Sequence, residues 1–168
     1  KDAYSELTFT YDTLDRVKTV DNAGTPEAPH VVLTYTYDAT GNVQTVKDTI
    51  DGVAGATTTY TYDTLDRLKT LQQTGNQVSD KFVDFSYNAI GQYTGVNRYS
   101  DLTRSNLSVQ STYVYDSLNR LTNLQHKNAA NEVLSFSGYK FDSASRITQV
   151  EDVNGVTDYG YDQRDQLR

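Results

Sequence analysis

Apolar and polar residues alternate in short stretches along the whole chain, and this pattern predicts β-strands. From Val31 to Tyr37, every second residue is a valine, leucine or tyrosine, so these side chains share one face of an extended strand. Asp38, followed three residues later by Gly41, is a turn signal, and the alternation resumes at Val43. The pattern predicts a β-hairpin here, and we find no convincing helix pattern in any segment.

The same hairpin pattern occurs seven times. Each copy has two aromatic residues two positions apart, an Asp or Asn, two variable residues, and then (in six copies) a Gly, Asn or Asp. The turns start 20 to 28 residues apart, at Asp12, Asp38, Asp63, Asn88, Asp116, Asp142 and Asp162. A period of about 25 residues indicates tandem units that stabilise one another. We therefore expect residues 1–168 to form one array, its last copy truncated, within a longer protein.

The turn residues favour a type I turn closed by a left-handed residue. An Asp or Asn at the first position accepts hydrogen bonds from backbone amides further along the turn. The fourth position needs a positive φ, which Gly, Asn and Asp tolerate. It is occupied by Asp15, Gly41, Asp66, Gly91, Asn119 and Asp165. Ser145 fits this position poorly. The structural turn residues that we expect are the seven first residues together with Gly41, Gly91 and Asn119.

This turn fixes the register of each hairpin and places an aromatic residue opposite an aliphatic one, a stabilising cross-strand pair. The expected pairs are Tyr11–Val17, Tyr37–Val43, Tyr62–Leu68, Tyr115–Leu121 and Phe141–Ile147. By the same register Phe9 faces Thr19. The other residues of the predicted aromatic rows are Tyr35, Tyr60, Tyr87, Tyr113 and Tyr139.

A second aliphatic residue follows three positions after the first in most copies. These residues are Val20, Val46, Leu71, Val96, Leu124 and Val150. Strict alternation would send them to the opposite face of the sheet. Either both faces of the sheet are partly covered, or a β-bulge corrects the alternation.

Four turns carry an apolar residue at the third position, where a polar one is usual. They are Leu14, Leu65, Ile90 and Leu118. We expect these side chains to rest on a neighbouring repeat or on the strands beneath. A docking row for a partner is the alternative.

The segments between the hairpins are rich in Gly, Asn and Asp and have no apolar periodicity, which predicts loops at the opposite end of the strands. They cover residues 21–30, 47–56, 72–81 and 126–133. The insert around Ser100–Ser108 is the longest, and its sequence gives no prediction of its conformation.

The composition narrows the class of protein. The net charge of −7 and the pI near 4.7 disfavour a nucleic-acid or anionic-membrane partner. Hydrophobic residues make up 36% of the chain and tyrosines number 14, which favours strands with modest burial over a thick core. The absence of cysteine excludes disulfides, thiol catalysis and cysteine-based metal sites.

No arrangement of residues predicts catalysis, a cofactor or a metal site. The aspartates have a role in the turns, and the loops lack the ligand spacing of an EF-hand. His30 and His126 fall in predicted loops without a serine, cysteine or metal-ligand companion, so we expect surface polar residues. The tyrosine rows could stack sugars, although cross-strand packing explains them better. We expect a protein that is not an enzyme.

Three segments resemble the RHS or YD repeat, whose consensus is Tyr-x-Tyr-Asp-x-x-Gly-Arg-Leu. They are residues 35–46, "YTYDATGNVQTV", residues 60–71, "YTYDTLDRLKTL", and residues 113–124, "YVYDSLNRLTNL". The resemblance covers essentially the whole chain. It implies an all-β fold of tandem antiparallel hairpins that form a twisting β-strip, a section of an RHS/YD-type shell. In bacterial RHS and toxin-complex proteins such a shell encloses a C-terminal toxic polypeptide, and in teneurins a related barrel supports cell-surface adhesion.

The resemblance implies a structural function. The chain would be a wall segment of a shell that encapsulates or presents a C-terminal effector polypeptide in a secreted or cell-surface protein. The alternative is an extracellular module that binds carbohydrates or a cell surface, which exposed, continuous aromatic rows would favour. The expected partners are further YD repeats, an enclosed polypeptide or glycans, and a second copy through the exposed edges near Lys1–Tyr11 and Tyr159–Arg168. The self-cleavage site of toxin-type shells has no counterpart that we can find.

Overall fold

All regular elements of the described residues are β-strands. The computed structural model describes residues 6–23, 25–76 and 78–168. Residues 1–5, in the first predicted edge segment, and positions 24 and 77, in two predicted linkers, lie outside the described residues. The strands are β1 (Thr8–Tyr11), β2 (Val17–Asp21), β3 (Val31–Tyr37), β4 (Val43–Ile50), β5 (Val53–Tyr62), β6 (Leu68–Gly75), β7 (Lys81–Tyr87), β8 (Tyr93–Tyr99), β9 (Leu107–Tyr115), β10 (Leu121–Asn128), β11 (Val133–Phe141), β12 (Ile147–Asp152) and β13 (Gly155–Asp158). The described residues include no helix that could cross a membrane.

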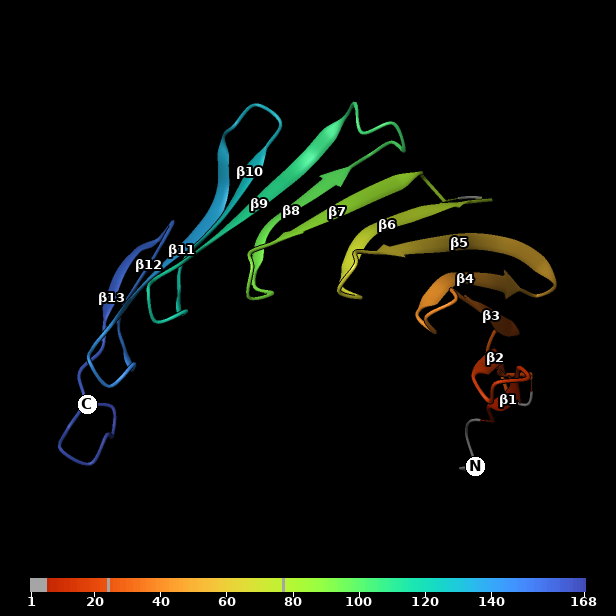
Figure 1. Ribbon diagram of the computed structural model, residues 1–168, viewed down its shortest axis with the longest axis horizontal. Helices are drawn as coiled ribbons and strands as arrows, with labels where there is room; N and C mark the ends of the chain where they lie inside the picture. The colour runs from red at the N-terminus through yellow and green to blue at the C-terminus, as the bar shows by residue number, and fades with distance from the viewer. Residues whose placement is uncertain (1–5, 24, 77) are drawn as a thin grey trace. The chain divides into compact units, whose positions relative to one another are not determined.

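The chain divides into two compact units with the same architecture. The first comprises residues 1–84 and 100–105, and the second residues 85–99 and 106–168. In each unit the strands follow one another in chain order, each antiparallel to the next (Figure 1): β1 to β7 in the first unit, with β7 represented by residues 81–84, and β8 to β13 in the second. The predicted fold class, all-β with tandem antiparallel hairpins, is confirmed.

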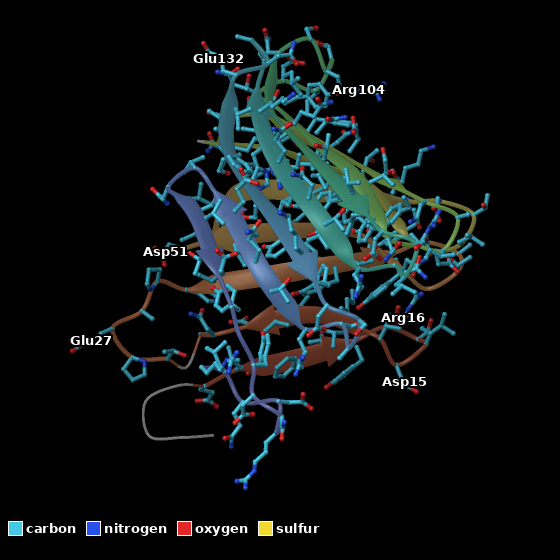
Figure 2. The ribbon with its side chains drawn as sticks, turned by 90° about the vertical axis from the view of Figure 1, so that its left-hand side faces the viewer. Asp15, Arg16, Glu27, Asp51, Arg104 and Glu132 are labelled. Carbon is cyan, nitrogen blue, oxygen red and sulfur yellow. The ribbon has the colours of Figure 1, made fainter. Side chains whose placement is uncertain are left out.

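The seven repeat turns have one backbone conformation. In the first, the Asp12 amide donates to the Arg16 carbonyl over 2.9 Å, and the Asp12 carbonyl accepts from the Asp15 amide over 3.2 Å. The fourth turn residue has positive φ in every copy. The prediction of positive φ at Gly41 and Gly91 is confirmed, with values of +97° and +87°. Figure 2 shows Asp15 and Arg16 of this turn at one end of the first unit's strands, and Glu27 and Asp51 at the other.

Ser145, which we expected to fit poorly, also takes the left-handed conformation, with φ +65°. The reason lies in the rest of its turn. The Asp142 carboxylate accepts hydrogen bonds from the amides of Ala144 and Arg146, both at 2.9 Å. These bonds fix the residues on either side of Ser145, so the turn imposes the conformation on a residue that does not prefer it.

A valine in place of Gly41 tests the turn directly. No atom lies within 4 Å of the Cβ that a side chain would add, so the cost is backbone strain alone. We expect Gly41→Val to lower the free energy of unfolding by about 1 kcal/mol or more. Gly41→Asn should cost clearly less, because Asn119 holds the same position with φ +63°. Urea unfolding of both variants measures the difference, and equal costs would contradict the turn assignment.

The hairpin register agrees with the aromatic–aliphatic pairs predicted next to the turns and corrects one pair further along. Tyr11 pairs with Val17, and the pairs predicted in the second, third, fifth and sixth hairpins are also present. Phe9, however, faces Val20 and not Thr19, because Lys18 is an extra residue in a β-bulge.

The bulge resolves the two alternatives for the second aliphatic residue. The bulge recurs in the hairpins that contain Tyr37, Tyr62, Tyr115 and Phe141. It restores the second aliphatic residue to the aromatic face, opposite the first aromatic residue of the copy. The resulting pairs are Tyr35–Val46, Tyr60–Leu71, Tyr113–Leu124 and Tyr139–Val150.

Several predicted linkers are strands. Residues 47–56 belong to β4 and β5, joined by Asp51 and Gly52 alone. Both residues have positive φ, +50° and +79°, as a type I′ hairpin turn requires. The Asp-Gly pair is a strong hairpin signal, and the prediction of a loop missed it because residues 47–56 show no regular alternation of apolar and polar side chains. β6 likewise continues to Gly75.

The linker at 126–133 and the insert at 100–108 contain the repeat turn at the opposite end of the strands. The Asn128 amide donates to the Glu132 carbonyl over 3.0 Å, and Asn131 has φ +62°. In the insert, Asp101 Oδ1 accepts from the Ser105 amide over 3.1 Å, and Arg104 has φ +62°. The same five-residue turn therefore closes hairpins at both ends.

The sheets are thin. Among the described residues only Phe82, Val96 and Ser111 are buried. The apolar turn residues are exposed, which contradicts the expected packing: the exposed fractions of Leu14, Leu65, Ile90 and Leu118 are 69%, 66%, 63% and 63%. These residues lie beyond the last cross-strand pair of each hairpin, where no neighbouring strand reaches.

Candidate functional site: the junctions between repeats

An aspartate and an arginine hold each of four turns together. Asp116 is representative: its Oδ1 accepts from the amides of Leu118 (2.9 Å) and Arg120 (3.0 Å), and its Oδ2 accepts from Nε of Arg120 (2.7 Å). Nη2 of Arg120 lies 2.7 Å from the same Oδ2, so two nitrogens of the guanidinium contact one carboxylate oxygen. The same pairs occur between Asp12 and Arg16, Asp63 and Arg67, and Asp142 and Arg146.

These donors lower the pKa of the turn carboxyls below the ordinary value of 3.8. For Asp12 and Asp63 the largest cause is the hydrogen bond from the arginine side chain, and for Asp116 and Asp142 it is the hydrogen bond from the arginine's backbone amide. The pKa of Asp38, whose turn has no arginine, is lowered chiefly by the Thr40 hydroxyl.

Arg16, Arg120 and Arg146 also reach the following repeat. The guanidinium carbon lies over the ring of the next repeat's second aromatic residue, with distances to the ring centroid of 4.3 Å for Arg16 on Tyr37, 4.5 Å for Arg120 on Phe141 and 4.6 Å for Arg146 on Tyr161. Arg120 Nη1 also donates to the Asp142 carbonyl (3.1 Å) and Ser145 Oγ (3.2 Å) in the next turn.

The tyrosine hydroxyl closes a gap between adjacent hairpins. Pairing of β2 with β3 begins at Thr19 and Thr34, although β2 itself begins at Val17. The two hairpins therefore diverge toward the turns. The Tyr37 hydroxyl spans this gap and donates to the Val17 carbonyl over 2.7 Å. Tyr62 and Tyr161 make the same bond to the carbonyls of Val43 (2.9 Å) and Ile147 (2.8 Å).

Burial raises the pKa of Tyr62 and of Tyr115 above the ordinary value of 10.0. Both rings lie at the second aromatic position of their repeats. The protonated hydroxyl is the form that donates the hydrogen bond, so the phenol of Tyr62 stays a donor at neutral pH.

The hydroxyl bond predicts opposite effects for two matched variants. Tyr37→Phe is expected to lower the free energy of unfolding by about 1 kcal/mol, because the Val17 carbonyl loses its donor. Phe141→Tyr is expected to raise it by up to about 1 kcal/mol, because by analogy with Tyr37, Tyr62 and Tyr161 the new hydroxyl would donate to the equivalent carbonyl, that of Leu121. Urea unfolding of the two variants measures both effects. A neutral Tyr37→Phe together with a destabilising Phe141→Tyr would refute this role of the hydroxyl.

The lowered pKa values predict acid unfolding. A carboxyl whose pKa is lower in the folded state contributes stability above its ordinary value of 3.8 and loses it as the pH falls through the folded value. These carboxyls should not change stability between about pH 7 and pH 5, and stability should fall steeply below about pH 4. Urea midpoints across this range measure the effect. Asp63→Asn should weaken the acid response, and a midpoint that stays constant to about pH 2.5 would contradict the assignment.

The hydrogen bonds of these junctions hold neighbouring repeats together and occupy the side chains that catalysis would need. The carboxylate oxygens of Asp116 accept from four donors, and the lowered pKa keeps the group ionised, so it is no proton donor at neutral pH. Within residues 6–23, 25–76 and 78–168, no group of three or more His, Cys, Asp or Glu side chains could hold a metal ion.

His126 contradicts the prediction of an isolated loop histidine. It lies on β10, and its Nδ1 is 2.7 Å from the Oγ of Ser111 on β9. Nη1 of Arg98 donates to the same oxygen over 2.8 Å. The exposed fraction of Ser111 is 0%, so no substrate can reach this hydroxyl as a nucleophile. A register extended to residue 126 would have found the pair, because His126 and Ser111 are cross-strand partners.

His30 is a surface residue, as expected. Its imidazole is 46% exposed, and Nε2 lies 2.9 Å from Oδ1 of Asp21. This carboxyl also caps its own turn, since the amide of Ala23 donates to it over 2.8 Å.

Most of the predicted aromatic residues are half-buried. Tyr11 is the exception, with an exposed fraction of 57%, and Phe9 beside it is 45% exposed. Tyr11 lines an open cleft of about 410 Å³ together with Tyr35, Arg16 and Lys18. The prediction missed Tyr93, whose ring centroid is 4.9 Å from that of Tyr87 and 6.0 Å from that of Tyr113. Tyr93 lies at the position that Val17 and Val43 occupy in their copies.

Comparison with known proteins defines the fold. No protein-family model and no curated protein matches the chain. Among solved structures, a chain of the crystal structure of TcdB2-TccC3-Cdc42 superimposes with a TM-score of 0.74 and 17% identity, over 94% of this chain and 9% of that chain. A chain of the TcdB2-TccC3-TEV crystal structure matches with a TM-score of 0.40 and 16% identity, over 96% of this chain and 12% of that chain.

The first of these likenesses establishes the class: the chain has an RHS/YD-repeat fold. It spans about a tenth of the length of the chains that it matches. The recurring Tyr-Asp-Arg junction is the local structure that corresponds to the repeat motif.

Proposed function

We propose that the chain is a structural wall segment of an RHS/YD-type shell that encloses or presents a C-terminal effector polypeptide in a secreted or cell-surface protein. The observation that carries the proposal is the junction between repeats. Its aspartates, arginines and tyrosines are bonded to one another or to the backbone, and their contacts join one hairpin to the next. Side chains that are bonded in this way connect neighbouring hairpins and are not available for catalysis. We therefore also propose that residues 1–168 act as one non-enzymatic array.

The full-length parent protein tests this proposal. Limited proteolysis with mass spectrometry would map cleavage in the polypeptide that follows the repeats. In the wild type this polypeptide should resist cleavage, and Arg120→Ala combined with Phe141→Ala should expose it by opening one junction. Leu118→Ala is the control, because its side chain is 63% exposed and contributes to no junction. A wild type whose downstream polypeptide is cleaved as fast as an unfolded chain would refute encapsulation.

A specific observation supports a second function, carbohydrate binding. The exposed rings of Phe9 and Tyr11 lie on the aromatic face at the start of the first unit, and Arg16 and Lys18 contribute polar groups to the cleft beside Tyr11. Flat aromatic surfaces with polar neighbours suit sugar rings. Affinity electrophoresis on soluble polysaccharides should show retardation that Tyr11→Ala abolishes and Tyr60→Ala does not. No retardation on any polysaccharide would remove this candidate.

A further inference from the structure

A hydrogen-bonded chain of three side chains crosses three strands of the second unit. Arg98 on β8 donates from Nη1 to Ser111 Oγ on β9 over 2.8 Å, and that oxygen is 2.7 Å from Nδ1 of His126 on β10. Ser111 is the central member and the most deeply buried residue described, with an exposed fraction of 0%. This cluster is separate from the Tyr-Asp-Arg junctions and takes no part in the proposed function.

The chemistry of the three groups favours one direction for each hydrogen bond. A guanidinium can only donate, so Ser111 Oγ accepts from Arg98. Of the two groups bonded to Ser111 Oγ, only Nδ1 of His126 can accept the hydroxyl proton. A histidine that accepts at Nδ1 is neutral and carries its proton on Nε2. The cluster is therefore complete only while His126 is uncharged.

We propose that Arg98, Ser111 and His126 form an acid-sensitive latch that holds β8, β9 and β10 together at neutral pH and releases them when His126 takes up a proton. Protonation converts Nδ1 from an acceptor to a donor. The buried Ser111 hydroxyl then loses its acceptor, and two cationic groups point at one oxygen. Both changes disfavour the folded arrangement.

The strands around His126, which are β8, β9 and β11, carry no carboxylate that could offset the positive charge of a protonated imidazole. β9 carries no charged residue, and its titratable side chains are Tyr113 and Tyr115. The only charged residue of β11 is Lys140, and His126 is paired there with Ser135. On β10 itself the neighbouring charge is Lys127.

The nearest carboxylate in sequence is Glu132, in the turn after β10. Its Oε2 accepts a hydrogen bond from Nδ2 of Asn128 over 2.6 Å. The charge balance around His126 is therefore positive once the imidazole is protonated, with Arg98 on one side and Lys127 adjacent in the strand.

Hydrogen exchange of the 168-residue chain at about pH 7.5 and about pH 5 tests the latch. In the wild type, protection factors in β8, β9 and β10 should fall about tenfold at the lower pH, while those of β4 and β5 change little. His126→Asn retains an acceptor oxygen that cannot be protonated, so its protection should be the same at both pH values. His30→Asn, which alters the other histidine, should respond as the wild type does.

Two results would overturn the proposal. One is a wild type whose protection in β8 to β10 does not change with pH, and the other is a His126→Asn variant that keeps the full pH response. A direct measurement on the wild type avoids any dependence on variant folding. The nitrogen NMR shifts of His126 at about pH 7.5 should show the proton on Nε2, and a proton on Nδ1 would contradict the direction of the hydrogen bonds.

Discussion

Phe82→Ala is expected to lower the free energy of unfolding of the first unit by about 3 kcal/mol, because it removes a large side chain from a buried position. Phe82 lies on β7 and is 5% exposed, whereas most side chains of these thin sheets are only half-buried. The guanidinium of Arg104, from the segment at 100–105, covers the ring at 5.2 Å from its centroid. A large cavity at this position cannot be refilled by a second layer of side chains.

Chemical unfolding with urea, followed by tyrosine fluorescence, measures this effect. Phe9→Ala is the matched control: it removes the same side chain where it is 45% exposed, so the loss should be below about 1 kcal/mol. Arg104→Ala should cost about 0.5–1 kcal/mol if the cation–π contact contributes separately from the burial of the ring. Similar losses for Phe82→Ala and Phe9→Ala would show that Phe82 is no centre of packing.

The repeat turns could be predicted from the sequence because their determinants are local. Asp142 shows this well: its carboxylate bonds to amides two and four residues away, within one five-residue window. The aromatic–aliphatic pairs nearest the turn follow from the same window. The register was wrong only beyond the bulge, at Phe9, because one extra residue shifts every pair that follows it.

The extent of the strands could not be predicted in the same way. A strand in a single-layered sheet has solvent near both faces, so its polar residues need not alternate with apolar ones. Thr57, Thr59 and Thr61 illustrate this, since they form one face of β5. The sequence pattern therefore predicts a loop at residues 47–56, although Asp51 and Gly52 form the turn of a regular hairpin.

The contacts between repeats depend on residues about 20 positions apart, which a local pattern does not connect. The bond from Tyr37 to the Val17 carbonyl and the stacking of Arg16 on Tyr37 require the order and spacing of the hairpins. The Ser111–His126 pair likewise requires the register of β9 with β10. The recurrence of Tyr, Asp and Arg indicates that these residues have a role in every repeat, but it does not identify the residues that they contact.

Hydrogen exchange is expected to differ by about 100-fold or more between the middle and the outermost strands of the array. Every residue of β1 and of β13 is exposed, and among the described residues β1 is paired with β2 alone. Within the first unit β4 and β5 should exchange slowly and β1 fast. Within the second, β9 and β10 should exchange slowly and β13 fast. An antiparallel strand with one partner has unpaired amides along its free edge, and those amides exchange without any opening of the sheet.

Hydrogen exchange at low and at high protein concentration distinguishes free edge strands from edge strands that pair with a second copy. In a dilute monomeric sample, mass spectrometry of exchanged peptides should show the gradient, with the fastest exchange in β1 and in residues 159–168. At higher concentration, slower exchange confined to β1 and β13 would show that two copies pair edge to edge, as the exposed backbone groups allow. Equal protection of outer and middle strands in a strictly monomeric sample would mean that the outer strands are as stable as the inner ones. The seven repeats would then form a self-contained domain, and the proposal of a wall segment continued by further repeats would be wrong.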